Sequence, residues 1–349
     1  MRIIFRKIYF FKLFLISLSI LKLVLAECIS ELTDEQSDIP SYIRTAASCD
    51  EDGNVIELWL KYQNLKKFPV GIGQNFSKLQ HLYLGGNYIE TINFEDFQNF
   101  ENLTTLDLSK NMISYVEKGT FDSLSTLVTL DLSRNKISDI KEVTFDSLTS
   151  LVTLDLSQNS ISKIESGAFN QLPFLNELDL SFNQITAITD SAFSGLQTLK
   201  ILMLQFNQLS AIYEGTFKGL QQLQKLNLAN NKLNAIDEFS FQSLTALLNL
   251  QLTSNKIQNI ENVFHINLKK TVEELWENLE GNSLEQIFEN TFEDLKNLTE
   301  LELSINKISS IESNSFQNLH NLEDLNLGYN LIKELKNNTF YGLQNLANL

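Results

Sequence analysis

Three histidines are the first side chains to consider for acid–base or metal chemistry, and they lie far apart in the sequence: His81, His265 and His320. A hydrolytic nucleophile needs a base within hydrogen-bonding reach, and a zinc site needs ligands at short spacings; the sequence shows neither. Gly71-Ile72-Gly73 lacks the rest of a phosphate-binding loop, and no nucleophile elbow occurs. The sequence therefore predicts no catalytic residue, no metal site and no cofactor.

Four aspartates recur at intervals of 24 residues: Asp107, Asp131, Asp155 and Asp179. If each holds the same place in successive strands, the carboxylates lie about 5 Å apart. Like charges at that spacing repel one another and favour a counter-ion, so this acidic strip could bind a cation or a basic peptide. The alternative is that aspartate simply belongs to the repeated motif LDLS. A dedicated calcium site is not favoured.

Apolar residues take the outward positions in the units that follow, and we expect four of them to cluster beside the acidic strip: Phe182, Ile201, Met203 and Phe206. Exposed apolar patches often mark interaction sites, and aromatic side chains are favoured anchors. The alternative is that these are scattered surface hydrophobes without a role. Three further aromatic residues are expected near the N-terminal end of the same face: Trp59, Tyr62 and Tyr83.

A repeat of 24 residues positions all these side chains. Asparagines mark it at Asn87, Asn111, Asn135, Asn159, Asn183, Asn207, Asn231, Asn255, Asn282, Asn306 and Asn330. In each unit LxxLxL alternates with the period of two of a short strand, which places the leucines inside. The chain must turn away from the strand at the asparagine. Its amide can pair with backbone groups of its own and adjacent turns that would otherwise be buried without partners.

The second half of each unit supplies the outer core. A phenylalanine recurs at Phe97, Phe121, Phe145, Phe169, Phe193, Phe217, Phe241, Phe292, Phe316 and Phe340. An aromatic row of this kind predicts core packing rather than a ligand site. The bulkier outer half makes the stack curve, with the strands lining the inner side.

The whole pattern, LxxLxLxxNxIxxIxxxxFxxL, resembles the leucine-rich repeat in its longer, extracellular form, from about Val55 onward. The resemblance implies an α/β solenoid curved like a horseshoe, with a parallel β-sheet on its concave face and about 11 repeats plus a truncated last one. It also implies a binding protein without enzymatic activity, as in Toll-type ectodomains, Slit-like proteins and matrix proteoglycans. The concave face is the usual binding surface of such proteins, but the fold alone does not specify the partner.

Two irregularities interrupt the pattern. The step from Asn255 to Asn282 is 27 residues, and Trp276 and Glu277 resemble an insertion that bulges the strand there, either as a local functional bulge or, more in keeping with the pattern, as a drifted repeat. In the same unit His265 stands at the expected phenylalanine position, with Phe264 one place earlier. At the other irregularity, residues 346–349 begin a further unit without a polar cap. We therefore expect either a truncated gene product or a last turn that frays.

The N-terminal residues predict export. Residues 1–26 combine a basic start, an apolar stretch and small residues before Glu27, as in a cleaved signal peptide. Residues 27–54 form a capping region in which Cys28 and Cys49, the two cysteines of an exported chain, predict one disulfide; the solenoid is residues 55–349. Four glycosylation sequons begin at Asn75, Asn102, Asn297 and Asn337.

The charge balance narrows the choice of partner. The chain has a formal net charge of −16, and without residues 1–26 it keeps 22 basic against 43 acidic side chains, a net charge of −21. A surface this acidic argues against nucleic acids and anionic lipid. We therefore expect a secreted or cell-surface scaffold that binds an extracellular protein or glycan. The alternatives are a truncated ectodomain of a transmembrane receptor, which a missing C-terminal segment would anchor, and a matrix component that self-associates.

Overall fold

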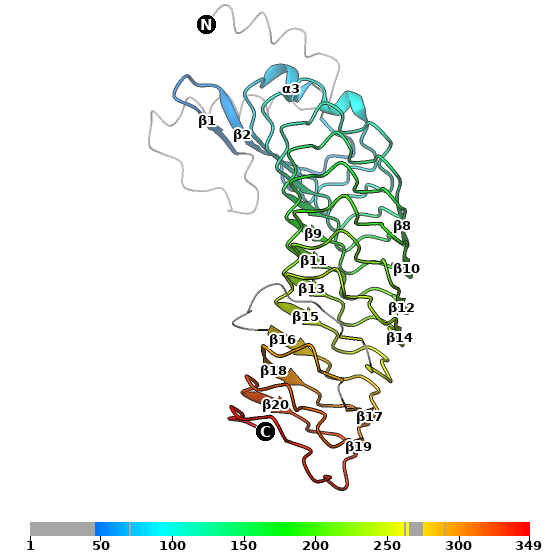
Figure 1. Ribbon diagram of the computed structural model, residues 1–349. Helices are drawn as coiled ribbons and strands as arrows, with labels where there is room; N and C mark the ends of the chain where they lie inside the picture. Colours follow the sequence, from blue (N-terminus) through cyan, green and yellow to red (C-terminus); the bar gives the residue numbers. More distant parts are fainter. Residues whose placement is uncertain (1–45, 70, 262, 265–274, 290) are drawn as a thin grey trace, which may run out of the picture.

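The protein is a solenoid of stacked turns. The computed structural model describes residues 46–69, 71–261, 263–264, 275–289 and 291–349. One strand from each turn joins a single sheet on the inner side of a curved stack, and short strand pairs lie on the outer side (Figure 1). The sheet contains, in spatial order, β1 (Ala46–Cys49), β2 (Val55–Trp59), β3 (His81–Tyr83), β4 (Thr105–Asp107), β5 (Thr129–Asp131), β7 (Thr153–Asp155), β9 (Glu177–Asp179), β11 (Ile201–Met203), β13 (Lys225–Asn227), β15 (Asn249–Gln251), β16 (Leu275–Asn278), β18 (Leu298–Glu302) and β20 (Asp324–Asn326).

The outer side of the stack is built from turns and two-residue strands. These strands are β6 (Asp139–Ile140), β8 (Lys163–Ile164), β10 (Ala187–Ile188), β12 (Ala211–Ile212), β14 (Ala235–Ile236), β17 (Gln286–Ile287) and β19 (Ser310–Ile311). Helix is confined, in the described part of the chain, to the single turns α3 (Ile72–Asn75) and η2 (Phe94–Phe97). None of the described helices is long and apolar enough to span a membrane. The predicted parallel-strand solenoid is confirmed.

The core continues from turn to turn without a break. Parallel pairing places each inward strand leucine beside the next, as Leu130 beside Leu154, and both are fully buried. The predicted phenylalanine column is also core: the rings of Phe121, Phe145 and Phe169 stack at centroid separations of 6.1 and 6.2 Å. Each turn therefore buries its apolar face only against its neighbours, as expected for a repeat protein.

The asparagine column ties adjacent turns together. The Asn135 side chain donates to the carbonyl oxygens of Leu108, in the preceding turn, and Leu132, in its own turn, at 3.0 Å each. Its Oδ1 atom accepts from the backbone N–H of Ile113 at 3.0 Å. The same set of bonds recurs along the column, for example at Asn183. The predicted role of the asparagine is confirmed: it satisfies backbone groups that no strand partner reaches.

Antiparallel pairing of β1 with β2 begins the sheet at its N-terminal end, before the parallel pairing of β2 with β3. Cys49 ends β1, and its thiol is not free. Cys28 lies outside the described residues, as does the predicted signal peptide, so the disulfide and the signal stay predictions.

The predicted insertion at Trp276 and Glu277 was wrong. Trp276–Asn278 pair in register with Asn249–Gln251 on one side and Glu300–Glu302 on the other. The register shifts between Leu275 and Trp276, where the partner strand β18 has one unpaired residue more than β16. Glu277 therefore holds a register position that leucine holds in both neighbouring strands. The three extra residues of this unit precede Trp276.

Phe264 completes the phenylalanine column in the same unit. It is buried, and its ring stacks on Phe292 at 6.1 Å. His265 lies outside the described residues. The column therefore tolerates a shift of one residue in its spacing.

Candidate binding surface

Each repeat presents three kinds of exposed residue near its strand. The first and third residues of the strand flank a buried leucine and face the concave side, as Thr153 and Asp155 flank Leu154. The residue directly before the column asparagine lies just beyond the strand. Its backbone is left-handed in every described turn from Tyr62 to Tyr329, with φ between 53° and 72°. Asparagine and glycine tolerate this conformation best, and other residues adopt it at a cost of about 1–2 kcal/mol.

The acidic strip is in register as predicted. Parallel pairing places the four aspartates of the strip side by side along β4, β5, β7 and β9. Oδ1 of each aspartate accepts the backbone N–H two residues later, at 2.8–2.9 Å. Asn227, Asn278 and Asn326 hold equivalent positions and make the same bond. An oxygen acceptor of this length closes the turn at this position, and an amide serves as well as a carboxylate. It is not indispensable, because Tyr83 and Met203 hold the same register position without one.

The negative charge of the strip is only partly compensated. Nζ of Lys61 lies 2.7 Å from Oδ2 of Asp107. Burial raises the pKa of Asp131, and the neighbouring carboxylates Asp107 and Asp155 raise it further, against the hydrogen bonds from Ser133. Burial likewise raises the pKa of Asp155, and the Asp179 carboxylate adds to that rise. No group of three acidic, histidine or cysteine side chains in the described chain could hold a metal ion.

The expected apolar patch divides into two parts. Ile201 and Met203 lie on β11 facing the concave side, half-buried, in register with Glu177 and Asp179 of β9. Phe182 and Phe206 lie beyond the strands, at the left-handed positions. Their rings stack at 4.3 Å and are 46% and 45% exposed. The patch therefore begins on the sheet beside the acidic strip and has its most exposed part at the edge where the chain leaves the sheet.

The aromatic residues at the N-terminal end contact one another. Trp59 and Tyr83 stack with ring centroids 5.5 Å apart, and Nζ of Lys61 lies 5.2 Å from the Tyr83 ring. Tyr62 packs against Gly86, where a Cβ atom would come within 2.2 Å of the Tyr62 ring. These contacts, together with the ion pair of Lys61 to Asp107, were not predicted. Their partners lie one or two turns apart, so only the register of the turns could have revealed them.

The histidines form no catalytic arrangement in the described chain. His81 lies between Thr105, with Nδ1 3.0 Å from its Oγ1 atom, and Glu57, with Nε2 3.9 Å from its Oε1 atom. These side chains stand in a row across β2, β3 and β4. The backbone N–H groups of these strands point along the sheet into the ladder, so none faces the row to stabilise an oxyanion. His320 Nδ1 contacts only the Gly342 carbonyl oxygen, at 3.1 Å.

The four sequon asparagines lie outside the strands of the concave face, although Leu298 and Thr299 of the Asn297 sequon belong to β18. Asn75 and Asn337 are exposed, whereas Asn102 and Asn297 are half-buried. The Asn102 side chain donates to the Ser77 carbonyl oxygen at 2.8 Å. Burial would not obstruct a glycan on Asn75 or Asn337, although the Asn75 side chain donates to the Gly71 carbonyl oxygen. A glycan on Asn102 would leave one amide N–H for the bond to Ser77.

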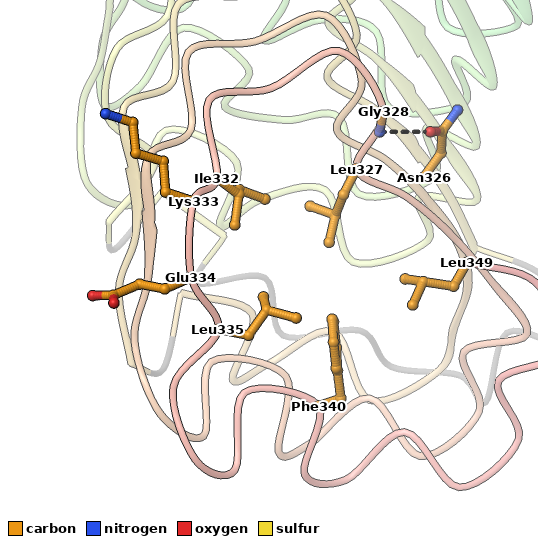
Figure 2. A pocket seen from close by; sticks show the side chains of 9 residues that line it. All are labelled: Asn326, Leu327, Gly328, Ile332, Lys333, Glu334, Leu335, Phe340 and Leu349. Carbon is orange, nitrogen blue, oxygen red and sulfur yellow. Dashed lines mark hydrogen bonds between the residues drawn. The ribbon is translucent and has the colours of Figure 1, made fainter.

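A hollow of about 600 Å³ opens at the C-terminal end of the described stack (Figure 2). Its apolar lining consists of Leu327, Ile332, Leu335, Phe340 and Leu349. The residues at the first four of these positions one turn earlier are buried: Leu303, Ile308, Ile311 and Phe316. The hollow is therefore the uncovered core layer of the last turn rather than a site with its own polar recognition groups.

Comparison with known protein families identifies the same repeat. The sequence profile of the family described as "Leucine rich repeat" matches residues 54–113, 78–137, 101–161, 125–185, 149–200, 173–233, 221–269, 278–332 and 296–349. A search of curated proteins finds no match.

Two solved structures share the fold. An internalin from Listeria monocytogenes is 22% identical with a TM-score of 0.55, over 84% of this chain and 86% of that one. A structure of the Toll–Spatzle complex of Drosophila is 23% identical with a TM-score of 0.52, over 80% of this chain and 45% of that one. At these identities the likeness concerns the fold alone.

Proposed function

Because the chain belongs to the leucine-rich repeat family, a family of binding scaffolds, we propose that it recognises an extracellular protein through its concave face. The proposed contact area is the acidic strip from Asp107 to Asp179 together with the adjoining apolar patch of Ile201, Met203, Phe182 and Phe206. The partner segment would be basic where it meets the strip and apolar where it meets β11. The partner of the Drosophila Toll structure, Spatzle, is a protein as well.

The observation that carries the proposal is the row of four aspartates in register on adjacent strands, of which Asp107 alone has an ion-pair partner within 4.0 Å in the described chain. Burial and neighbouring carboxylates raise the pKa of Asp131 and Asp155, so their ionised forms are held in an unfavourable environment. The turn does not need the charge there, since asparagine makes the same bond at Asn227. A basic partner would relieve the repulsion, and half-buried Met203 beside Asp179 would contribute apolar contact area.

Selection of random peptides displayed on phage tests the proposal. The bait is the full chain, and the counter-bait is the variant Asp131→Asn, Asp155→Asn, Asp179→Asn, which keeps every acceptor oxygen. We expect enriched peptides to carry Lys or Arg next to apolar residues and to lose at least tenfold in affinity for the variant. A second variant, Ile201→Thr with Met203→Asn, uses residues that the chain itself has at these positions in Thr153 and Asn227. Peptides that bind all three proteins equally would refute the concave site.

Export is the second part of the proposal. The signal-like residues 1–26, the paired cysteines Cys28 and Cys49 and the four sequons support a secreted or cell-surface location. Expression in a secreting eukaryotic cell should release a chain that begins at Glu27 and migrates faster after glycosidase treatment. Retention of the chain inside the cell, with residues 1–26 intact, would contradict this part.

A further inference from the structure

The edge where the chain leaves the sheet differs in charge from the rest of the protein. This ladder edge consists of the residues directly before and directly after each column asparagine. It also includes the two neighbours of Gln63, which holds the equivalent place 24 residues before Asn87. It contains six cations and no carboxylate in a chain with 43 acidic side chains. The cations are Lys110, Arg134, Lys136, Lys232, Lys256 and Lys307, all exposed. None of them has a carboxylate within 4.0 Å in the described structure, whose two ion pairs involve Lys61 and His81.

Local structure does not call for lysine at these places. The position after the asparagine holds Ser160, Gln184 and Gln208 in other turns, so the fold accepts uncharged residues there. Lys232 and Lys256 belong to adjacent turns, whose backbones lie about 5 Å apart along the ladder, and Nζ of Lys232 donates to Oε1 of Gln208 in the turn before, at 2.9 Å. Two like charges on adjacent turns repel each other. Solubility does not explain them either, because added lysine reduces the net charge of an acidic protein.

Exposed apolar side chains flank the lysines on the same edge. Phe206 precedes them, 45% exposed, and Ile305 lies beside Lys307, 50% exposed. Both adopt left-handed backbone, with φ of 57° and 54°, although a β-branched or bulky residue is among the least suited to it. Neither burial nor backbone preference therefore accounts for them. A partner that covers them would gain apolar burial.

From this arrangement we propose a second interaction surface, at Phe206, Lys232, Lys256, Ile305 and Lys307, that binds an acidic segment of another protein. Phe206 and Ile305 are separated by four turns, a span of about 19 Å at the usual strand spacing, which about six residues of extended chain cover. The segment would place an apolar residue at each end and carboxylates between them. The apolar ends favour a protein over a sulfated glycan or a nucleic acid.

This surface shares Phe206 with the proposed concave contact area and is otherwise separate from it. It takes a partner of opposite charge, and three of its residues, Lys232, Lys256 and Lys307, have no part in the strip. An experiment can therefore support or refute either proposed surface without deciding the other.

A labelled hexapeptide with tryptophan at each end and four glutamates between tests the inference, by fluorescence anisotropy with the full chain at low ionic strength. We expect saturable binding that Lys232→Gln, Lys256→Gln, Lys307→Gln weakens at least tenfold. The matched control, Lys118→Gln, Lys163→Gln, Lys218→Gln, removes three exposed lysines elsewhere and should change binding less than twofold. A peptide with serine in place of both tryptophans should bind at least fivefold more weakly, as the intact peptide should to Ile305→Ser.

Three results would overturn the inference. The first is no saturable binding of the hexapeptide. The second is equal loss in the two lysine variants, which would show an effect of net charge alone. The third is binding of the serine peptide, or of heparin, as strongly as the tryptophan peptide, because the surface would then be a general anion site.

Discussion

The acidic strip and the ladder edge are neighbouring surfaces with repeated residues, but their residue types have different causes. In the strip, the side-chain oxygen of Asp155 closes a turn by accepting the Ser157 N–H at 2.8 Å, and Asn227 does the same without a charge. On the edge, the side chain of Lys256 makes no comparable hydrogen bond, and Ile305 adopts a left-handed backbone to which a β-branched residue is poorly suited. A repeated residue therefore indicates function only after its local hydrogen bonds have been accounted for.

Removal of a column asparagine should cause the largest loss of stability, because its side chain makes three buried hydrogen bonds to the backbone. Asn159→Ala leaves the N–H of Ile137 without its partner. It also removes one of the two amide donors of the Leu132 and Leu156 carbonyl oxygens, which keep Asn135 and Asn183. At about 1–3 kcal/mol for the unsatisfied N–H and about 1 kcal/mol for each of the two other lost hydrogen bonds, we expect a loss of about 3 kcal/mol or more. Urea unfolding followed by circular dichroism measures it.

The half-buried Asn330 provides the comparison for Asn159. Its bonds lie at the end of the described stack, where water reaches the freed groups more easily. Asn330→Ala should cost clearly less than Asn159→Ala. Equal losses would show that burial does not set the strength of the column.

Two substitutions at Asp155 separate the contribution of its hydrogen-bond acceptor to stability from that of its negative charge. Asp155→Ala removes the bond to the Ser157 N–H and should lower stability by about 1 kcal/mol. Asp155→Asn keeps the bond and should leave stability unchanged or slightly raised. If both variants lose the same amount, the carboxylate charge itself stabilises the turn, and our distinction between the two surfaces fails.

The pH dependence of stability isolates the charge of the strip. Burial, with neighbouring carboxylates, raises the pKa of Asp131 and Asp155 in the folded protein. Their protonation therefore favours the folded state, a stabilisation that is full below the ordinary aspartate pKa and is lost as the pH rises through the raised values. The unfolding free energy of the wild type should thus rise, relative to the Asp131→Asn, Asp155→Asn, Asp179→Asn variant, as the pH falls from neutral. A difference that does not vary with pH would contradict these shifts.

The lysines of the edge should matter least for stability. They are exposed and have no carboxylate partner in the described chain, so Lys232→Gln, Lys256→Gln, Lys307→Gln should change the unfolding free energy by less than about 0.5 kcal/mol. Thermal unfolding compared with the wild type measures it. A loss above 1 kcal/mol would assign these lysines a structural role instead.

The fold could be predicted from the sequence because its causes are periodic. The leucines, the phenylalanine column and the column asparagines repeat with the geometry of one turn, so a single unit such as Leu127 to Leu148 describes most of the stack. Prediction failed at Trp276, where residue counting could not show which strand carries the extra residue. Register, and not residue type, decides that point.

The candidate surface was predictable only in part. The strip follows from spacing alone, and so does the neighbourhood of Ile201 and Met203. The left-handed backbone that carries Phe182 and Phe206 to the edge has no marker in those residues, because the conformation recurs at this place of every described turn whatever residue stands there. The pairing of Lys61 with Asp107 joins residues almost two repeats apart, and a side-chain contact across turns needs coordinates to be seen.

The central claim is that the charge of the strip serves binding while its oxygen atoms serve the fold. The most direct test is the affinity of a phage-selected basic peptide for the wild type and for the Asp131→Asn, Asp155→Asn, Asp179→Asn variant, measured by titration calorimetry. The account predicts at least a tenfold loss of affinity in a variant that unfolds at the same urea concentration as the wild type or a higher one. Unchanged affinity in that equally stable variant would contradict it.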